Sequence, residues 1–165
     1  MHAPDIQFIT PTTPGELEAT RDIFREYAAQ LGIDLCFQNF DAELADLPGE
    51  YAAPQGILLL AMVDGDIAGC CAMRPLRGMD YSDACEMKRL YVRQAFRRLG
   101  LGRQLTEAIV DAARVAGYHH LLLLDTLSDM ESARALYADL CFEAIPPHYH
   151  NPIAGAHYLK LALQR

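Results

Sequence analysis

The sequence predicts an α/β fold with a mixed, mostly antiparallel sheet, a central parallel βαβ unit and helices on both faces. Three observations lead to this prediction. Strand-like runs pair as hairpins up to residue 92, strands and helices alternate after it, and the aliphatic run Leu121–Leu124 is typical of a strand covered on both faces. With 165 residues, 52% hydrophobic and 22% charged, and no internal repeat or separating linker, residues 1–165 are expected to form a single domain.

The N-terminal third is predicted to hold one strand and two helices. Residues 7–10 favour a strand. Thr13-Pro14-Gly15-Glu16 has the form of a capping box with proline at the first helical position, and apolar residues at helical spacing extend this helix over residues 14–31. The stretch 32–55 is less regular, with a short helix over residues 41–47.

The rest of the chain carries clearer signals. Asp64-Gly65-Asp66 joins two apolar runs as a hairpin turn, Gly117 stops the longest helix of this part, and Ser128-Asp129-Met130-Glu131 is a second capping box. A strand, a helix and a second strand in succession would form a right-handed parallel βαβ unit around that long helix. The expected elements are, in order, strands 57–63, 67–73 and 85–92, a helix over 101–116, a strand over 121–124, a helix over 130–140, and strands 142–145 and 157–163.

Charge is distributed unevenly along the chain. The net charge of −8 argues against a general nucleic-acid binder, so no nucleic-acid partner is expected. Residues 86–103 nevertheless carry six lysines and arginines against Glu86 alone, a local balance of +5. One basic segment in an acidic protein suggests a small anionic ligand held at one place.

Several other classes of protein are not expected. No apolar run approaches the ~20 residues of a membrane helix, and residues 1–9 lack the layout of a signal peptide, so no membrane partner and a cytoplasmic location are expected. The five cysteines form no CxxC pair and are odd in number, which favours reduced, mostly buried thiols. His148 and His150 lie two residues apart without a completing cluster, so no metal is expected.

The run Arg97-Arg98-Leu99-Gly100-Leu101-Gly102 lies between a predicted strand and the long helix. A helix N-terminus presents unpaired backbone N–H groups, and glycines without Cβ atoms let phosphate oxygens approach them. Arg97, Arg98 and Arg103 add positive charge. The run is neither a dinucleotide-binding GxGxxG nor a P-loop. On spacing alone, an anion site and a plain tight turn with solvated arginines both stay open.

Arg-x-x-Gly-x-Gly at 97–102, after a strand that ends Leu90-Tyr91-Val92, resembles the acyl-CoA signature of the GNAT superfamily of N-acetyltransferases. The resemblance extends over the aliphatic strand at 121–124 and over the helix Ala133-x-x-Leu136-Tyr137-x-x-Leu140-x-Phe142. It implies the GNAT-like fold, with residues 57–163 as the acyl-CoA-binding core and residues 1–56 as variable helices on the acceptor side. It also implies that acetyl-CoA is the co-substrate.

In proteins of this superfamily, the strand before the glycine-rich turn binds the pantetheine arm through its backbone, and one of its N–H groups meets the thioester carbonyl. The turn itself holds the pyrophosphate. Met130 stands where the family commonly has an asparagine that touches the cofactor, so that contact is absent or passes to Ser132. The cofactor-binding residues implied by the resemblance are Leu90, Tyr91, Val92, Arg97, Arg98, Leu99, Gly100, Leu101, Gly102, Arg103 and Ser132.

Two residues are implied in catalysis. Tyr137 matches the helix tyrosine that often protonates the departing CoA thiolate; the alternative is that it belongs to the core. Glu86 lies on the strand where some family members place a general base; the alternatives are an ion pair with Lys88 or Arg89, or deprotonation through water. Cys141 replaces a usual glycine before Phe142, which could alter the helix exit.

The resemblance therefore implies an N-acetyltransferase that moves an acetyl group directly to an amine acceptor in a ternary complex. No cysteine has the basic partner that a covalent mechanism needs. The acceptor is a small-molecule or peptide amine, the acidic surface favours a cationic one, and the protein is a monomer or homodimer. A non-catalytic acyl-CoA sensor and a binder of another phosphate ligand are the alternatives. Candidate acceptor contacts are residues 148–151, residues 37–40 and Tyr51.

Overall fold

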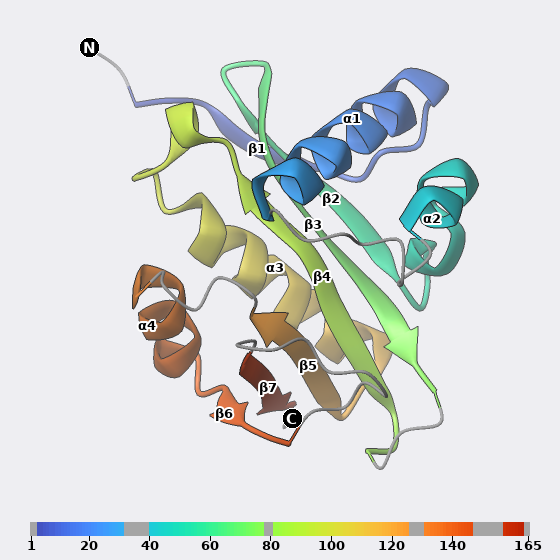
Figure 1. The fold of residues 1–165 in the computed structure, drawn as a ribbon, viewed down its shortest axis with the longest axis vertical. Coiled ribbons are helices and arrows are strands. Elements are labelled where there is room, and N and C mark those ends of the chain that lie inside the picture. Colours follow the sequence, from blue (N-terminus) through green and yellow to red (C-terminus); the bar gives the residue numbers. More distant parts are fainter. Residues whose placement is uncertain (1–2, 32–39, 78–80, 126–130, 147–156, 164–165) are drawn as a thin grey trace.

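The computed structural model describes residues 3–31, 40–77, 81–125, 131–146 and 157–163. One sheet runs through the molecule, and helices pack on both of its faces (Figure 1). The elements are β1 (Ile6–Ile9), α1 (Pro14–Leu31), α2 (Phe40–Asp46), β2 (Ile57–Val63), β3 (Asp66–Leu76), β4 (Ala84–Val92), α3 (Leu101–Ala116), β5 (His120–Asp125), α4 (Glu131–Asp139), β6 (Glu143–Ala144) and β7 (His157–Ala162). Two short 3₁₀ helices, Gly49–Tyr51 and Gln94–Phe96, were not predicted.

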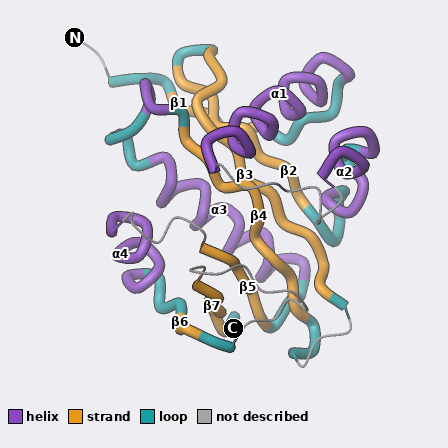
Figure 2. Tube along the Cα trace, in the orientation of Figure 1, coloured by secondary structure: helices purple, strands orange, loops and turns teal. Residues whose placement is uncertain are grey.

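The sheet has seven strands in the order β1-β2-β3-β4-β5-β7-β6. β4 and β5 pair in parallel, and the other five neighbouring pairs are antiparallel. The connection between the two parallel strands is α3 (Figure 2). The predicted mixed sheet with a central βαβ unit is confirmed, and most predicted boundaries lie within one or two residues of those in the structure.

Local signals in the sequence explain the start of α1 and the end of α3. At the start of α1 the Thr13 hydroxyl accepts from the Glu16 N–H, and the Glu16 carboxylate accepts from the Thr13 N–H, each at 3.1 Å. This is the predicted capping box. At the end of α3, Gly117 adopts φ +91°, and its N–H closes the last turn on the α3 carbonyls. Glycine reaches this left-handed conformation without the steric cost of a Cβ atom.

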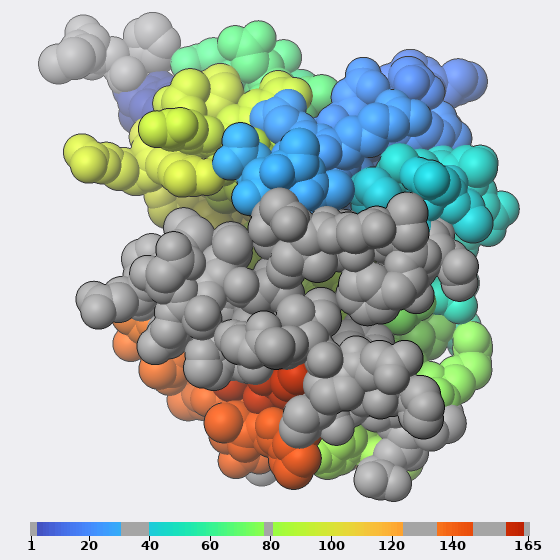
Figure 3. Space-filling view, in the orientation of Figure 1, coloured from blue at the N-terminus to red at the C-terminus, as the bar shows by residue number. Residues whose placement is uncertain are grey.

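Two apolar cores lie on opposite faces of the sheet. One contains α3 residues such as Leu105 and Ile109, together with Tyr137 of α4, packed against the strands. The other lies beneath α1 and α2 and contains Ile23 and Phe24. We call these sides the α3/α4 face and the α1/α2 face. In the space-filling view α1 (blue) and α2 (cyan) lie side by side on the α1/α2 face (Figure 3).

β4 is interrupted by a bulge. Cys70 of β3 pairs with Tyr91, but Ala72 pairs with Lys88, so Cys71 alone opposes two residues of β4. The bulged residue, Arg89, has φ +62°. Before the bulge Cys85 and Met87 pack on the α3/α4 face, and after it Leu90 and Val92 do. Because of the extra residue, the consecutive side chains of Lys88 and Arg89 both lie on the α1/α2 face.

Candidate active site

β4 and β5 pair along only part of their length. The parallel register ends at Met87 and Leu123, whereas β4 continues to Val92 and β5 to Asp125. The end of β5 stays paired with β7, and the end of β4 stays paired with β3. The two strands therefore part, and among the described residues the β5 side of Leu90–Val92 has no strand beside it. All three residues named for the pantetheine contact lie at this opening.

The glycine-rich turn leads from β4 into α3. Arg98 and Gly100 both have positive φ, +73° and +76°, and Gly100 is the N-cap of the helix. A Cβ atom added at Gly102 would meet nothing within 4 Å, so this part of the first turn faces open space. The first helical hydrogen bond runs from the Gln104 N–H to the Gly100 carbonyl, and no side chain caps the helix. The N-terminus of α3 thus offers free backbone donors to an anion.

Three arginines lie at this turn. Arg97 and Arg98 are exposed, and Arg97 donates its Nε–H to the Val92 carbonyl at 3.1 Å. Arg103 forms an ion pair with Asp139 of α4, with the Nη2–Oδ2 distance at 2.7 Å. Arg97 and Arg98 thus carry exposed charge on the turn, whereas the charge of Arg103 is paired with Asp139.

The other basic residues of the segment point elsewhere. Arg93 donates to both carboxylate oxygens of Glu26 on α1, each at 3.0 Å, and the Tyr91 hydroxyl donates to one of them at 3.1 Å. Arg89 binds Glu43 of α2. Lys88, Arg89 and Arg93 therefore do not add their charge to the glycine-rich turn. The bulge and the alternation along β4 direct half of the charge of the segment to the α1/α2 face.

Glu86 is 1% exposed on the α1/α2 face of β4. It lies opposite Arg74 of β3 in the register, and Nε and Nη2 of Arg74 lie 3.2 and 3.1 Å from the same Glu86 oxygen. Nη1 of Arg74 also binds Glu50 at 2.9 Å. An ion pair of Glu86 thus exists, and it joins the carboxylate to Arg74 on the neighbouring strand. An ionised carboxylate is stabilised in the interior by such a guanidinium.

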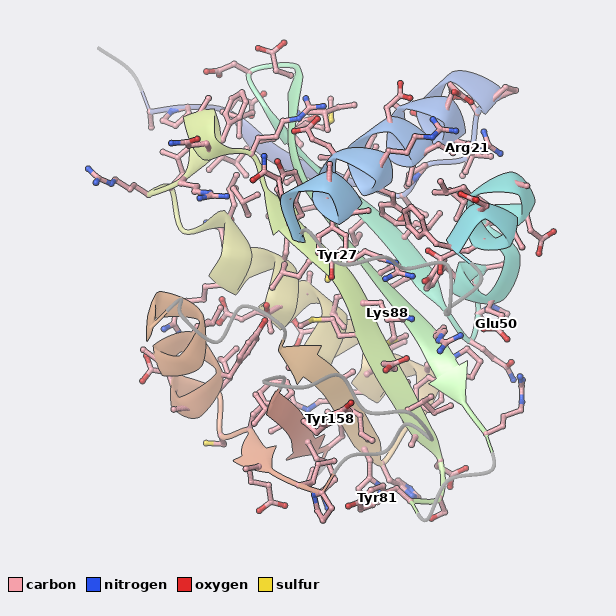
Figure 4. The ribbon with its side chains drawn as sticks, in the orientation of Figure 1. Arg21, Tyr27, Glu50, Tyr81, Lys88 and Tyr158 are labelled. Carbon is pink, nitrogen blue, oxygen red and sulfur yellow. The ribbon has the colours of Figure 1, made fainter. Side chains whose placement is uncertain are left out.

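Lys88 lies on β4 between Glu86, which pairs with Arg74, and Arg89, which pairs with Glu43. Burial lowers the pKa of Lys88 to about 8, although the nearby negative charge of Glu86 opposes that shift. Figure 4 shows Lys88 on β4, with Glu50 and Tyr27 also on the α1/α2 side. Burial raises the pKa of Tyr27 to about 12, so this phenol stays protonated at neutral pH. The face therefore combines ionised pairs with a neutral phenol and a lysine that titrates near neutrality.

Tyr137 lies on the opposite side of the sheet. It is 7% exposed within the α3/α4 core, and its ring packs edge-on against Phe142 with centroids 5.6 Å apart. Ser132 lies in the first turn of α4, but its side chain is outside the described residues. The structure thus places the two catalytic candidates, Glu86 and Tyr137, on opposite faces of the sheet rather than together.

Cys141 takes over the conformation of the glycine that it replaces. Its φ is +72°, and the N–H groups of Cys141 and Phe142 return to the Ala138 and Tyr137 carbonyls at 3.0 Å. This is the Schellman exit that glycine usually provides. The departure at Cys141 therefore leaves the helix end intact. Cys70, Cys71 and Cys85 are buried free thiols, as expected, whereas Cys141 is exposed.

The acceptor-side candidates are only partly described. Tyr51 is buried and packs edge-on against Phe24 in the α1/α2 core, with centroids 6.4 Å apart. Phe40 is buried at the start of α2. Residues 37–39, Met130 and residues 148–151 lie outside the described residues.

Sequence reasoning missed Arg74, Glu50, Glu43 and Glu26, because no local pattern marks residues that meet only through the register and the helix packing.

A pocket of about 410 Å³ opens elsewhere on the molecule. It is lined by the α2–β2 connection, the start of β2 and the last turn of α3, including Pro54, Ile57 and Val115. This turn lies about 20 Å along α3 from the glycine-rich turn. None of the predicted cofactor-binding residues lines the pocket.

Within the described ranges, no helix is long and apolar enough to cross a membrane, and no three or more His, Cys, Asp or Glu side chains form a metal-binding group.

The chain is similar in sequence to proteins named as N-acetyltransferases. The chain is 39% identical over 153 residues to an uncharacterised N-acetyltransferase of Schizosaccharomyces pombe, covering 92% of this chain and 91% of that protein. It is 28% identical over 145 residues to an uncharacterised N-acetyltransferase of Escherichia coli, covering 87% and 86%.

Solved structures share the fold. An acetyltransferase of the GNAT family from Staphylococcus aureus superposes with a TM-score of 0.75 at 17% identity, over 97% of this chain and all of that one. The yncA protein of Salmonella typhimurium, solved with its cofactor acetyl-CoA, gives a TM-score of 0.68 at 19% identity, over 96% and 94%. The model of the Acetyltransferase (GNAT) family matches residues 17–141. The chain therefore belongs to the GNAT family of acetyltransferases.

Proposed function

We propose that the protein is an N-acetyltransferase that binds acetyl-CoA at the opening between β4 and β5 and transfers its acetyl group to an amine. One observation carries the proposal: β4 and β5 stop pairing after Met87, and the end of β4 continues through the glycine-rich turn into the uncapped N-terminus of α3. A long ligand with an anionic end fits this arrangement, because its phosphates meet helix donors while its other end lies along a strand edge. The yncA protein of the same fold is solved with acetyl-CoA.

The donor side uses mostly backbone groups. The N–H groups of residues 98–103 hold the pyrophosphate, and Arg97 and Arg98 add charge that water screens only in part. Leu90, Tyr91 and Val92 line the pantetheine arm. One of their N–H groups donates to the thioester carbonyl and stabilises the oxyanion as the tetrahedral intermediate forms.

The acceptor side is the α1/α2 face. Glu86 receives the proton of the acceptor ammonium, and Arg74, which donates to one of the Glu86 oxygens, orients the carboxylate. The neutral amine attacks the thioester carbon, and the intermediate collapses with loss of the CoA thiolate. Tyr137 protonates that thiolate from the α3/α4 face. The attacking nitrogen loses its second proton to solvent as the amide forms, and a proton from solvent restores the phenol. Placement of the base and the acid on opposite faces suits a reaction centre that lies in the opening between the strands.

The acceptor is a small-molecule or peptide amine, and acetyl transfer takes place in a ternary complex without a covalent enzyme intermediate. Burial raises the pKa of the Cys70 thiol well above its ordinary value and that of Cys71 as well, so neither is a thiolate at neutral pH. The net charge of −8 favours cationic acceptors over nucleic acid. We place the protein in the cytoplasm, as a monomer or homodimer.

A panel of amines, assayed by release of free CoA thiol, tests this proposal. We expect turnover with at least one cationic amine, and calorimetry should show binding of CoA but not of ATP or NAD at matched concentrations. CoA binding without turnover on any amine would indicate a non-catalytic acyl-CoA sensor. Failure to bind CoA would overturn the proposal.

A further inference from the structure

Arg89 adopts a backbone conformation that its side chain does not favour. Its φ of +62° lies in the left-handed region, where L-residues with a Cβ atom are disfavoured and glycine is the usual choice. Among the described residues, the other non-glycine positions with positive φ are Asp64, Asp83, Arg98 and Cys141, which lie in turns or at a helix exit. Arg89 instead lies inside a strand, so contacts from the surrounding structure must hold it there.

Those contacts come from α2 and α1. The Arg89 guanidinium donates from Nε and Nη2 to the two carboxylate oxygens of Glu43, at 3.0 and 2.8 Å. The Arg89 side chain is 2% exposed and that of Glu43 15%. The guanidinium also lies over the rings of Phe40 and Tyr27, 5.1 and 6.0 Å from their centroids. A planar cation held by a two-point ion pair between two rings has little freedom to turn.

The bulge lies between the part of β4 that pairs with β5 and the residues at the opening between the two strands. Pairing with β5 ends at Met87, and the residues assigned to the thioester contact begin at Leu90, immediately after Arg89. The direction of an N–H group depends on the dihedral angles of the residue before it. A change of φ at Arg89 would therefore rotate the peptide groups of Leu90 to Val92 away from their present direction. A one-residue change in the bulge would also turn these side chains to the other face.

We propose that the Glu43–Arg89 ion pair is a positioning device that holds the bulge in β4 and so directs the N–H groups of Leu90 to Val92 into the opening between β4 and β5. The inference rests on the proposed acetyl transfer. Arg89 and Glu43 touch neither reactant in this scheme and act through the strand. Because Glu43 belongs to α2, the pair also joins the acceptor-side helices to the oxyanion donor.

Three variants separate the backbone conformation from the charge. Arg89→Ala loses the ion pair and still disfavours positive φ. Arg89→Gly loses the same ion pair but adopts positive φ freely. Glu43→Gln keeps the arginine and removes the charge that holds it. Arg25→Ala, which removes an exposed ion pair with Asp22 on α1, is the matched control.

We expect Arg89→Ala and Glu43→Gln to lower kcat about tenfold or more, with the KM for acetyl-CoA changed by less than about threefold, because the pyrophosphate contacts remain. Arg89→Gly should recover kcat to within about threefold of the wild type, although it lacks the same ion pair and therefore melts below the wild type. If the Glu43–Arg89 pair only stabilised the fold, kcat would instead fall in step with the melting temperature across the variants.

Equal kcat values for Arg89→Gly and Arg89→Ala, or a wild-type kcat in Glu43→Gln, would overturn the inference. A wild-type protein without turnover on any amine would instead overturn the proposed acetyl transfer, so the two failures are distinguishable. Thermal melting of each variant, with and without CoA, shows whether the fold and the cofactor site persist.

Discussion

Arg74 and Glu86 lie opposite each other in β3 and β4, and two nitrogens of the Arg74 guanidinium lie 3.1 and 3.2 Å from one carboxylate oxygen of Glu86. The carboxylate is 1% exposed, whereas the arginine side chain is 26% exposed. The pair therefore brings a buried negative charge to the α1/α2 face and neutralises it from the solvent side. Both the stability and the proposed chemistry of the protein depend on this arrangement.

Removal of the arginine should expose the cost of that burial. We expect Arg74→Met to lower the free energy of unfolding by about 2–3 kcal/mol, because Glu86 stays buried after the Arg74 guanidinium is removed. The double variant Arg74→Met with Glu86→Gln should lose clearly less than the sum of the single losses. Urea denaturation measures all three, with the exposed Arg25→Met as a control that changes stability by less than about 0.5 kcal/mol. Additive losses would contradict this coupling.

Glu86→Gln tests the proposed base directly. The amide has the size of the carboxylate but does not accept a proton, so we expect kcat to fall about 10²-fold at neutral pH. The KM for acetyl-CoA should stay within about twofold, because the cofactor contacts lie on other residues. Raising the pH should restore part of the rate, since the acceptor amine then loses its proton unaided. A wild-type kcat at neutral pH would show that the proton leaves by another route.

Tyr137→Phe removes a single oxygen from the α3/α4 core. Because the ring keeps its packing against Phe142, the melting temperature should change little. We expect kcat to fall about 10²-fold, because protonation of the thiolate is lost, while CoA affinity stays within about twofold. Tyr118→Phe is the matched control: it removes a phenol that donates to the Gln55 carbonyl at 2.7 Å, far from the glycine-rich turn. Equal rates for both variants would return Tyr137 to the role of a core residue.

The strand, the glycine-rich turn and the helix of the proposed donor site could be predicted from the sequence, because they depend on local backbone geometry. The left-handed dihedral angles at Gly100 favour glycine, the first turn of α3 at Gly102 faces open space, and the strand and helix around them carry local signals. The same holds for the capping box of α1 and for Gly117. These features are properties of a few consecutive residues.

The acceptor half could not be predicted in the same way. Glu43 lies 46 residues from Arg89 in the chain, and Glu26 lies 67 residues from Arg93, so helix packing alone brings them together. The bulge adds a second obstacle, since no glycine or proline marks Arg89, and without the bulge the alternation would place Lys88 and Arg89 on opposite faces. β3 likewise runs three residues beyond its predicted end at Met73, because Arg74 and Pro75 end the apolar run but not the pairing with β4.

Gly102→Asp should weaken CoA binding without lowering the stability of the fold. An added Cβ meets nothing within 4 Å, and a carboxylate in the first turn of α3 interacts favourably with the helix dipole. We therefore expect stability to stay the same or rise by up to about 0.5 kcal/mol. The same charge repels the pyrophosphate, so calorimetry should show CoA affinity reduced by about 10²-fold, whereas Gly102→Ala should bind within about tenfold of the wild type. Undiminished CoA binding by Gly102→Asp would place the pyrophosphate elsewhere.

Lys88 provides a test of the charge balance on the α1/α2 face through pH. Burial lowers its pKa from the ordinary 10.5 to about 8. Between these values the unfolded chain holds more protons than the folded one, so the stability of the wild type should rise with pH relative to a variant without the amine. At pH 7 the folded protein holds a charged, half-buried ammonium, and Lys88→Met should be more stable by about 1–2 kcal/mol after allowance for solvent screening.

This advantage of Lys88→Met should shrink as the pH rises through 8 and vanish near 10.5. Urea denaturation of both proteins at pH values from about 7 to 10 measures the difference, in which the titration of all other groups cancels to first order. Arg25→Met is the control, because a guanidinium does not titrate in this range and its stability difference should stay constant. A pH-independent difference for Lys88→Met would show that Lys88 keeps an ordinary pKa, and that the negative charges of Glu86 and Glu43 offset its burial completely.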